Sequence, residues 1–310
     1  MLRQDTLISD RPPFWSLLRI TFTLLAGYLA AAFAAAAILA FVSDQDFSNL
    51  SSEIDPSMAL PLLIVQGVVS FVVFIFFPVL HITTLERKPL LPLIHQRERL
   101  SQTLLLVLIL GLAFPLAISP ISEWNAQLKF PDFMSGFERW AREQEDTLQK
   151  MTDAVISFDT VGNLLLALFV MAVIAGVGEE LVFRGMIQNE LWRASNNIHL
   201  AIWASALVFS AIHMQFYGFV PRLLLGALFG YLYYWSGNVI VPMFAHFVNN
   251  AFAVIMKYLY NIKAISTDID EVESAPLSLV IVCTVVAAVL IYQIRKYYLS
   301  TPTETSQESY

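Results

Sequence analysis

Two adjacent acids interrupt an otherwise apolar stretch of the chain. From Thr160 to Gly178 the sequence holds Asn163 as its single large polar side chain, and Glu179 and Glu180 then stand side by side. An ionisable side chain inside a membrane span costs about 2.5–3.5 kcal/mol on insertion scales. Two glutamates at this place therefore indicate a specific task.

Helical spacing predicts different tasks for the two glutamates. Adjacent residues on a helix point about 100° apart, so Glu179 and Glu180 face different neighbours. Glu180 precedes Arg184 by four residues, which is the favourable order for an ion pair within one helix. This pairing would neutralise Glu180 and leave Glu179 free to face something else.

A histidine from the next apolar segment is expected at the level of Glu179. Taking the turn between the two segments near Asn196, Glu179 lies seventeen residues before it and His213 seventeen after it. Both side chains then lie roughly 25 Å along two antiparallel helices from that turn. Phe209 precedes His213 by four residues and is expected to line the same cavity.

A later apolar segment contributes a second polar pair. His246 and Asn250 are four residues apart and share one helical face. Counted from Gly237, they lie roughly 14 Å and 20 Å along their helix. Four polar side chains from three helices can therefore meet in one layer of the membrane.

These residue types fit hydrolysis of an amide bond by water. A glutamate in an apolar pocket can exchange a proton with water near neutral pH, and a neighbouring histidine can orient that water. A second histidine and an asparagine supply hydrogen-bond donors for an oxyanion at the amide carbonyl. The set Glu179, His213, His246 and Asn250 therefore predicts peptide-bond hydrolysis inside a membrane cavity.

The composition predicts an all-α, polytopic membrane bundle. Of the 310 residues, 57% are hydrophobic and only 14% charged, and the mean hydropathy is +0.64. A helix needs about 20 apolar residues to cross a bilayer, which predicts about eight transmembrane helices. The predicted spans are Phe14–Val42, Ala59–Ile82, Thr103–Ile121, Thr160–Arg193, His199–Met214, Phe219–Trp235, Asn238–Tyr260 and Ala275–Tyr297.

An even number of spans places both termini on one side of the membrane. The basic residues expected on that side predict that it is cytoplasmic, because loops rich in Lys and Arg stay inside. They are Arg3, Arg11, Arg87, Lys88, Arg97, Arg99, Arg295 and Lys296. We expect an integral protein of the bacterial inner membrane.

One amphipathic segment stands apart from the spans. Between Phe133 and Val155 apolar residues recur at helical spacing with charges between them, which predicts a helix lying in the membrane interface. This helix is either a connector or a lid over the site. We divide the chain into an N-terminal region (1–158), a core holding spans four to seven (159–260), and a last span with a disordered tail (261–310).

Other partners are not indicated by the sequence. The net charge of −7 and the lack of a basic stripe argue against nucleic acid, and the single Cys283 excludes an intramolecular disulfide framework. Gly226 and Gly230 form a small-xxx-small pattern that predicts close helix packing. The bilayer and a membrane-associated protein or peptide substrate are the expected partners.

In three ordered motifs the sequence resembles the CAAX prenyl protease and bacteriocin-processing family of intramembrane endopeptidases. The family pattern is EExxxR, then FxxxH, then HxxxN on a later helix. Here it reads "EELVFR" from Glu179, "FSAIH" from Phe209, and "HFVNN" from His246. The resemblance covers roughly Asn163 to Ala253.

The resemblance implies roles for individual residues. Glu179 would activate the attacking water together with His213, while His246 and Asn250 would stabilise the oxyanion. Glu180 and Arg184 would support the site. We do not carry over the prenylated substrate of the founding members, because nothing in the sequence indicates it.

The sequence leaves the metal question open. Zinc could be held by His213, His246 and Glu179, with a water as the fourth ligand. We favour a mechanism without a metal or other cofactor, because a glutamate and a histidine can activate water alone and Asn250 suits an oxyanion better than zinc.

Two other functions use the same residue types. Intramembrane Glu, His and Arg also build proton-coupled transporters, and a non-catalytic immunity or scaffold protein could retain the motifs. Loss of cleavage in Glu179→Ala and His213→Ala, with activity largely kept in Glu180→Gln, would favour the protease.

Overall fold

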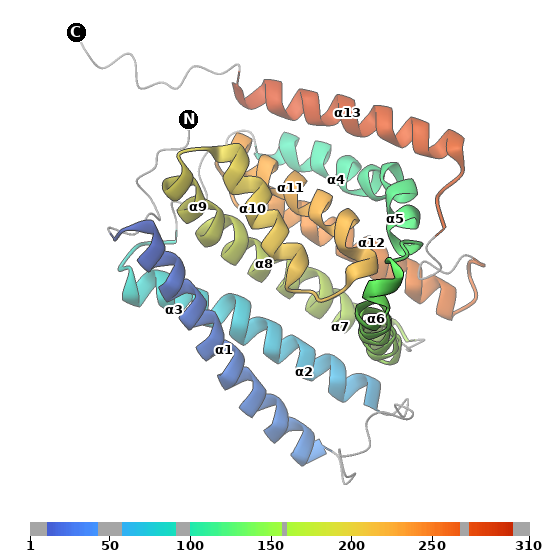
Figure 1. Cartoon of the computed structure of the whole chain (residues 1–310), viewed down its shortest axis with the longest axis horizontal. Coiled ribbons are helices and arrows are strands. Elements are labelled where there is room, and N and C mark those ends of the chain that lie inside the picture. The colour runs from blue at the N-terminus through green and yellow to red at the C-terminus, as the bar shows by residue number, and fades with distance from the viewer. Residues whose placement is uncertain (1–10, 43–57, 91–99, 157–159, 267–272, 300–310) are drawn as a thin grey trace.

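The computed structural model of the protein describes residues 11–42, 58–90, 100–156, 160–266 and 273–299. Throughout these residues the regular elements are helices, which pack side by side into one bundle (Figure 1). The predicted all-α, polytopic architecture is therefore confirmed. The predicted C-terminal tail falls largely outside the described residues, as do Arg3, Arg97 and Arg99.

Within the described residues, seven helical stretches are long and apolar enough to cross a membrane. This property follows from their length and composition, and each coincides with a predicted span. They are α1 (Pro13–Val42), the stretch from α2 to η4 (Ala59–Leu85), α4 (Leu100–Ala117), the stretch from α7 to α9 (Val161–Ser195), α11 (Phe219–Ser236), α12 (Ile240–Asn261) and α13 (Leu277–Leu299).

The remaining predicted span, the fifth (His199–Met214), is a shorter helix. Helix α10 (Ile198–Ala211) has 14 residues, which is roughly 21 Å at the α-helical rise and less than a bilayer core. It ends three residues before the predicted boundary at Met214, whose φ of 55° is left-handed. Instead of continuing the helix, the ring of His213 turns back and bonds the carbonyl of Phe209 at 2.7 Å.

A break also shortens the third predicted span. Helix α4 ends at Ala117, and a separate helix α5 (Ser119–Ala126) begins after Ile118. Pro120 stands in the first turn of α5, where its missing N–H is tolerated, whereas in the interior of a continuous helix it would remove a backbone hydrogen bond. The predicted end at Ile121 therefore lies in α5.

The span that carries the glutamates is not a uniform α-helix. It runs through α7 (Val161–Ala167), η8 (Leu168–Ile174), α8 (Ala175–Glu180), η9 (Leu181–Ile187) and α9 (Gln188–Ser195). Both η segments are π-helices of seven residues, so Glu179 and Glu180 end a short α-helical piece between two wider stretches. π-helical turns inside α-helices are frequent at functional sites.

The predicted amphipathic segment is a helix in the structure. A short 3₁₀ turn, η7 (Asp132–Met134), leads into α6 (Ser135–Ile156), which packs against α2 and α12. Val155 and Ile156 at its end are buried in a cluster with Leu63 and Val254. The placement of α6 in the membrane interface remains a prediction.

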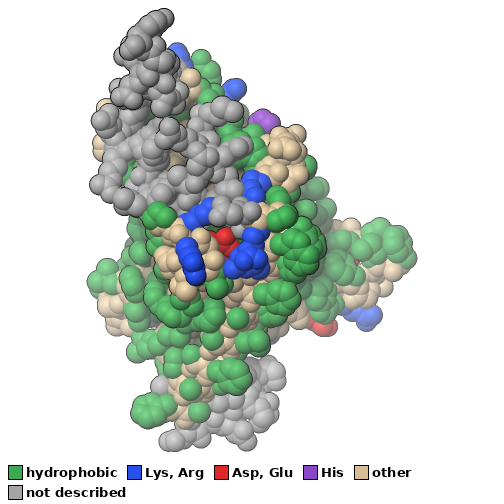
Figure 2. Space-filling model, turned by 90° about the vertical axis from the view of Figure 1, so that its left-hand side faces the viewer, with side chains coloured by type: hydrophobic (Ala, Val, Ile, Leu, Met, Phe, Trp, Pro, Cys, Tyr) green, Lys and Arg blue, Asp and Glu red, His purple; other side chains and the backbone are tan. Residues whose placement is uncertain are grey.

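Both ends of the described chain lie at the same end of the bundle. The start of α1 and the end of α13 are on the left in Figure 1, as expected if α10 crosses along with the seven longer stretches. Figure 2 looks onto this end and shows arginines and lysines gathered there. Arg193 joins two elements at this end, pairing with Glu190 at 2.6 Å and donating to the carbonyl of Arg11 at 2.8 Å. Which side of the membrane this end faces stays a prediction.

The small-xxx-small pattern of α11 allows a close approach to α10 and α9, as predicted. A Cβ on Gly226 would lie 3.1 Å from the Cβ of Ala206, and a Cβ on Gly230 would lie 2.8 Å from both Ile202 Cγ2 and Gln188 Oε1. Gln188 also donates to the carbonyl of Gly230 at 3.2 Å.

We therefore expect Gly230→Ala to destabilise the bundle. The added methyl group would overlap the branched side chain of Ile202, and overpacking of this kind costs about 1–3 kcal/mol. The change is measurable as a lower denaturation midpoint in detergent. Gly162→Ala is the matched control, because a Cβ at Gly162 on α7 meets no atom of the described residues within 4 Å. Equal stability of the two variants would contradict the close packing.

Candidate active site

The predicted ion pair between Glu180 and Arg184 is present. Glu180 Oε1 lies 2.7 Å from Arg184 Nη1, and both side chains are fully buried. The second guanidinium nitrogen of Arg184 donates to the carbonyl of Gly226 on α11 at 2.7 Å. The pair therefore joins two helices as well as neutralising a charge. Three aromatic rings surround this guanidinium at 5.1 to 5.9 Å, those of Phe183, Phe209 and Phe229.

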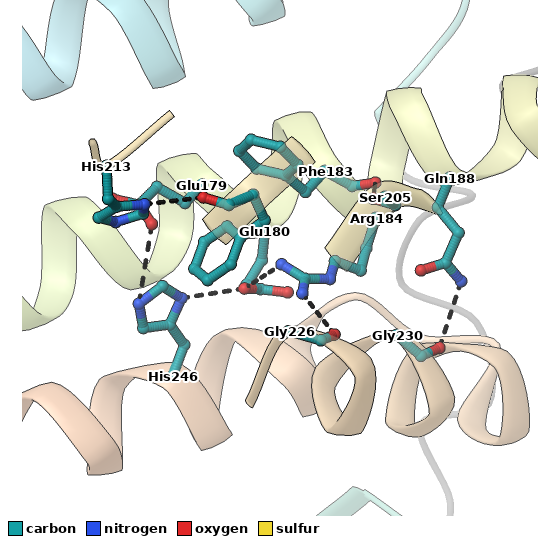
Figure 3. A network of polar contacts seen from close by, with 11 residues as sticks. Glu179, Glu180, Phe183, Arg184, Gln188, Ser205, His213, Gly226, Gly230 and His246 are labelled. Carbon is teal, nitrogen blue, oxygen red and sulfur yellow. Dashed lines mark hydrogen bonds and ion pairs between the residues drawn. The ribbon is translucent and has the colours of Figure 1, made fainter. Parts of the chain in front are cut away.

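Glu180 also holds His246, a contact that sequence reasoning missed. His246 Nδ1 lies 2.9 Å from Glu180 Oε1 (Figure 3). The ring of His246 also stacks on Phe229 at 5.1 Å. A carboxylate that accepts from Arg184 can only accept from the histidine as well, so Nδ1 must carry the proton. The other ring nitrogen of His246 is thereby turned towards Glu179.

Glu179 makes fewer polar contacts than Glu180. Its Oε2 lies 3.8 Å from His246 Nε2, too long for a hydrogen bond, and this buried oxygen has no hydrogen-bond partner among the described residues. Glu179 keeps 15% of its side-chain surface exposed, whereas Glu180 keeps none. The two adjacent acids thus occupy the different environments that their helical directions predicted.

His213 lies in the turn after α10. Its Nδ1 bonds the carbonyl of Phe209, so this nitrogen carries the proton and Nε2 of a neutral ring is free to accept one. His213 interacts electrostatically with His246, and Phe209 packs edge-on against both rings at 5.0 and 5.9 Å. In Figure 3 His213 and Glu179 stand at the same end of the polar network, with His246 below them.

Phe209 is a shared wall of the candidate site, as the sequence predicts. Its side chain is 3% exposed and also packs against Phe183 at 5.1 Å. The apolar ring separates the charged pair of Glu180 and Arg184 from the turn that holds His213.

Asn250 forms its hydrogen bonds with residues other than His246 and the two glutamates. Its side-chain nitrogen donates to the carbonyl of Met171 in η8 at 2.9 Å, and its oxygen accepts from Asn249 at 3.2 Å. Asn250 therefore ties α12 to the glutamate-bearing span one turn away from His246. One of its two N–H donors is used in this tie, and the other carries no bond to a described residue.

Helix α6 packs over the loop that follows His213. Phe137 and Trp140 contact Phe216 at 5.1 and 5.6 Å, and Arg142 lies over the ring of Tyr217 at 4.3 Å. Glu145 accepts from the backbone N–H of Tyr217 at 3.3 Å, and burial raises the pKa of its carboxyl. The contacts place α6 where either a connector or a lid would lie.

The far end of α6 is tied to α12. Lys257 lies 3.1 Å from Asp153, and Asn261 donates to the carbonyl of Ile156 at 2.6 Å. The helix is therefore held at both ends, which favours the connector.

Arg222, on the first turn of α11, belongs to the site but was not singled out from the sequence. It is close enough to interact electrostatically with both Glu179 and His213. Arg222 follows His213 by only nine residues, and this proximity was the signal that could have identified it.

The donors predicted for zinc do not gather into a metal site. Over the described ranges, no group of three or more His, Cys, Asp or Glu side chains is arranged to hold a metal ion. His213, His246 and Glu179 therefore do not fit zinc in this arrangement, and no step proposed below passes through a metal.

An apolar groove runs beside the site. It has a volume of about 550 Å³ and lies between the second span and the glutamate-bearing span, where Gly67, Val170 and Val177 line it. Its lining contains no ionisable side chain and none of the predicted site residues.

The fold and the site together define an integral membrane protein with a largely buried cluster of two glutamates, two histidines and two arginines. Residues 161–252 match the family of type II CAAX prenyl endopeptidases, described as Rce1-like. The family resemblance predicted from the three motifs is thereby confirmed, over the part of the chain that carries them.

Individual relatives show the same extent of similarity. The chain is 31% identical over 85 residues to the uncharacterized protein YpbD of Bacillus subtilis, covering 26% of this chain and 40% of that protein. It is 34% identical over 98 residues to the membrane-embedded CAAX protease MroQ of Staphylococcus aureus, covering 30% of this chain and 39% of that protein. The matches therefore span about two fifths of each relative. No solved structure matches the chain.

Proposed function

We propose that this protein is an intramembrane endopeptidase that hydrolyses a peptide bond of a membrane-associated protein or peptide with a directly activated water. The observation that carries the proposal is the arrangement of His246, which is anchored by Glu180 at 2.9 Å and faces the unpartnered Glu179 at 3.8 Å. The family match and the protease MroQ among the relatives support the same class of activity.

Glu179 is the proposed general base. Its free oxygen and Nε2 of His213 are both acceptors, so together they can hold the two protons of one water molecule. As the water oxygen attacks the carbonyl carbon of the peptide, Glu179 takes one proton and becomes a carboxylic acid. The C=O bond becomes a C–O⁻ single bond in the tetrahedral intermediate.

His246 and Asn250 are the proposed donors to this oxyanion. Because Nδ1 of His246 already carries a proton, donation from Nε2 requires the doubly protonated ring. Asn250 would use the N–H that is not bonded to Met171. When the C–N bond breaks, the proton on Glu179 passes to the leaving nitrogen, which yields an amine and a carboxylic acid. The acid carries the second proton of the water, and loss of this proton to Nε2 of His213 gives the new carboxylate.

Glu180 and Arg184 are proposed to position the machinery. Glu180 accepts from Nδ1 of His246 and so fixes the direction of its ring. Arg184 pairs with the carboxylate of Glu180 and offsets its negative charge. Activity in Glu180→Gln is therefore expected to be lower than the sequence alone indicated, because a glutamine cannot accept from Arg184 and His246 as a carboxylate does.

Cleavage by the purified protein tests the proposal. The protein would be reconstituted into liposomes with quenched fluorogenic peptides that contain an apolar span, while a pH-sensitive dye inside the vesicles reports proton flux. We expect cleavage without flux. Flux without cleavage would favour the transporter, and the absence of both would favour the non-catalytic immunity or scaffold protein. Dialysis against a chelator is expected to leave cleavage unchanged.

The natural substrate can be sought in cells. Membrane proteomes from cells that carry the wild-type protein or Glu179→Ala would be compared for uncut precursors. We place this activity in the bacterial inner membrane, with both termini cytoplasmic and the bilayer as the other partner. Nucleic acid remains an unexpected partner.

A further inference from the structure

Arg222 is a half-buried cation whose hydrogen-bonding capacity is only partly used. Its Nη2 donates to Oε1 of Gln215 at 2.6 Å. Its Nη1 is buried and has no hydrogen-bond partner among the residues that the structure describes. Within the same residues no carboxylate lies within ion-pair distance of this guanidinium.

The backbone beside Arg222 leaves room for its guanidinium. A Cβ added to Gly218 would lie 3.3 Å from Nη2 and 3.7 Å from Nη1 of Arg222. The guanidinium therefore lies flat against the loop that leads from His213 to α11. A glycine at position 218 lets it lie there, while Gln215 fixes one end of its fork.

Two carboxylates act on Arg222 from a distance. Glu145 lies on the α6 side and Glu179 on the side of the candidate site, and both interact with it electrostatically. His213 also interacts electrostatically with the guanidinium of Arg222. Arg222 therefore stands at the border between the proposed water-activating residues and the covering helix α6.

A guanidinium with a buried N–H donor that lacks a partner costs free energy unless a ligand supplies the missing hydrogen bond. An unmade hydrogen bond of a buried donor carries a desolvation penalty, and it is larger for a charged group. Arginine presents paired N–H donors whose planar geometry matches a carboxylate. Since Gln215 occupies Nη2, the free Nη1 offers a second donor next to it.

We propose that Arg222 is a binding site for a carboxylate of the substrate, next to the bond that is cut. This inference rests on the proposed function and specifies a chemical group of the substrate that the site would recognise. The carboxylate is either the free C-terminus of the substrate or the side chain of an Asp or Glu close to the scissile bond. The competing explanation is that Arg222 only links Gln215 and Glu145 and stabilises the loop.

Binding measured without turnover tests the inference independently of hydrolysis. Fluorescent apolar peptides would be titrated against Glu179→Gln protein in nanodiscs. The first pair of peptides differs only in a free or an amidated C-terminus, and the second only in an internal Asp or Asn. We expect one carboxylate peptide to bind roughly tenfold to a hundredfold more tightly than its neutral twin. The pair that shows the difference identifies the source of the carboxylate.

Substitution of Arg222 assigns the effect to this residue. In Arg222→Gln on the same background the preference should vanish while the neutral peptide binds as before, and Arg222→Lys should keep part of it. Arg139→Gln, an exposed position on α6, is the charge-matched control and should keep all of it. Equal affinities for acid and neutral peptides, or a preference that survives Arg222→Gln, would overturn the inference. If the wild type cleaved the acid and the neutral peptide at equal rates, the carboxylate site would be rejected and the proposed hydrolysis would stand. If the acid peptide bound more tightly but neither peptide were cleaved, only the proposed hydrolysis would be rejected.

Discussion

Replacing Glu179 by glutamine is expected to abolish hydrolysis while leaving the bundle folded. Glutamine has nearly the same shape but cannot take a proton from water, and removal of a general base typically costs 10²–10⁴-fold in rate. We expect a loss of roughly a thousandfold in the liposome cleavage assay. The folded state should persist, because Oε2 of Glu179 makes no hydrogen bond within the described residues that the amide would break.

The matched control for this prediction is Glu143→Gln. Glu143 is exposed on α6, so the same chemical change there removes a charge without touching the site. Its rate should equal that of the wild type. If Glu179→Gln retained more than about a tenth of the wild-type rate, water activation by this carboxylate would be rejected. Unfolding midpoints of both variants would show that the loss is chemical.

Replacing Arg184 by methionine is expected to cause the largest loss of stability. Methionine fills a similar volume, but it leaves the carboxylate of Glu180 buried without its cation and frees the carbonyl of Gly226. Breaking a buried pair by removing one partner costs about 3–5 kcal/mol. We expect a marked drop in the denaturation midpoint, together with loss of activity, because Glu180 also fixes His246.

An exposed pair of the same spacing serves as the comparison. Arg142 and Glu138 are also four residues apart and 2.8 Å from each other, but the Arg142 side chain is 45% exposed. Arg142→Met should change the midpoint little, since solvent already screens such pairs. If the double variant Glu180→Gln, Arg184→Met were no more stable than Arg184→Met alone, the uncompensated carboxylate could not be the cause of the loss.

The membrane spans and the internal ion pair were accessible from the sequence because both depend on one helix at a time. Long apolar runs identify the spans. The spacing of Glu180 and Arg184 identifies two side chains that meet on one helical face, and the structure places them 2.7 Å apart.

Contacts between helices were harder to predict, because they depend on which faces meet. His246 reaches Glu180 across α8 and α12, whereas Asn250, on the same face as His246, reaches the carbonyl of Met171 instead. The angle and position at which two helices cross decide which side chains become partners. The spacing of residues within one helix gives no information about that crossing.

Two features of the site arise from tertiary structure alone. The end of α10 at Ala211 puts His213 in a turn, so the straight-helix estimate of its depth does not apply. Arg222 stands in the first turn of its span, where the sequence suggests a charge at the membrane surface. In the structure its guanidinium is half-buried and donates to Gln215 in the loop that precedes α11.

The π-helical segment η8 bears on how the length of the glutamate-bearing span can change. A wider turn holds one more residue than a regular turn, so removal of a single residue between Leu168 and Ile174 would restore ordinary winding. Because the wider turn had absorbed that residue, the side chains beyond the deletion would keep their direction around the helix axis relative to α7. A homologue with a one-residue gap here should therefore carry its acids in the same direction, and a one-residue deletion in η8 of this protein should leave both carboxylates facing α12.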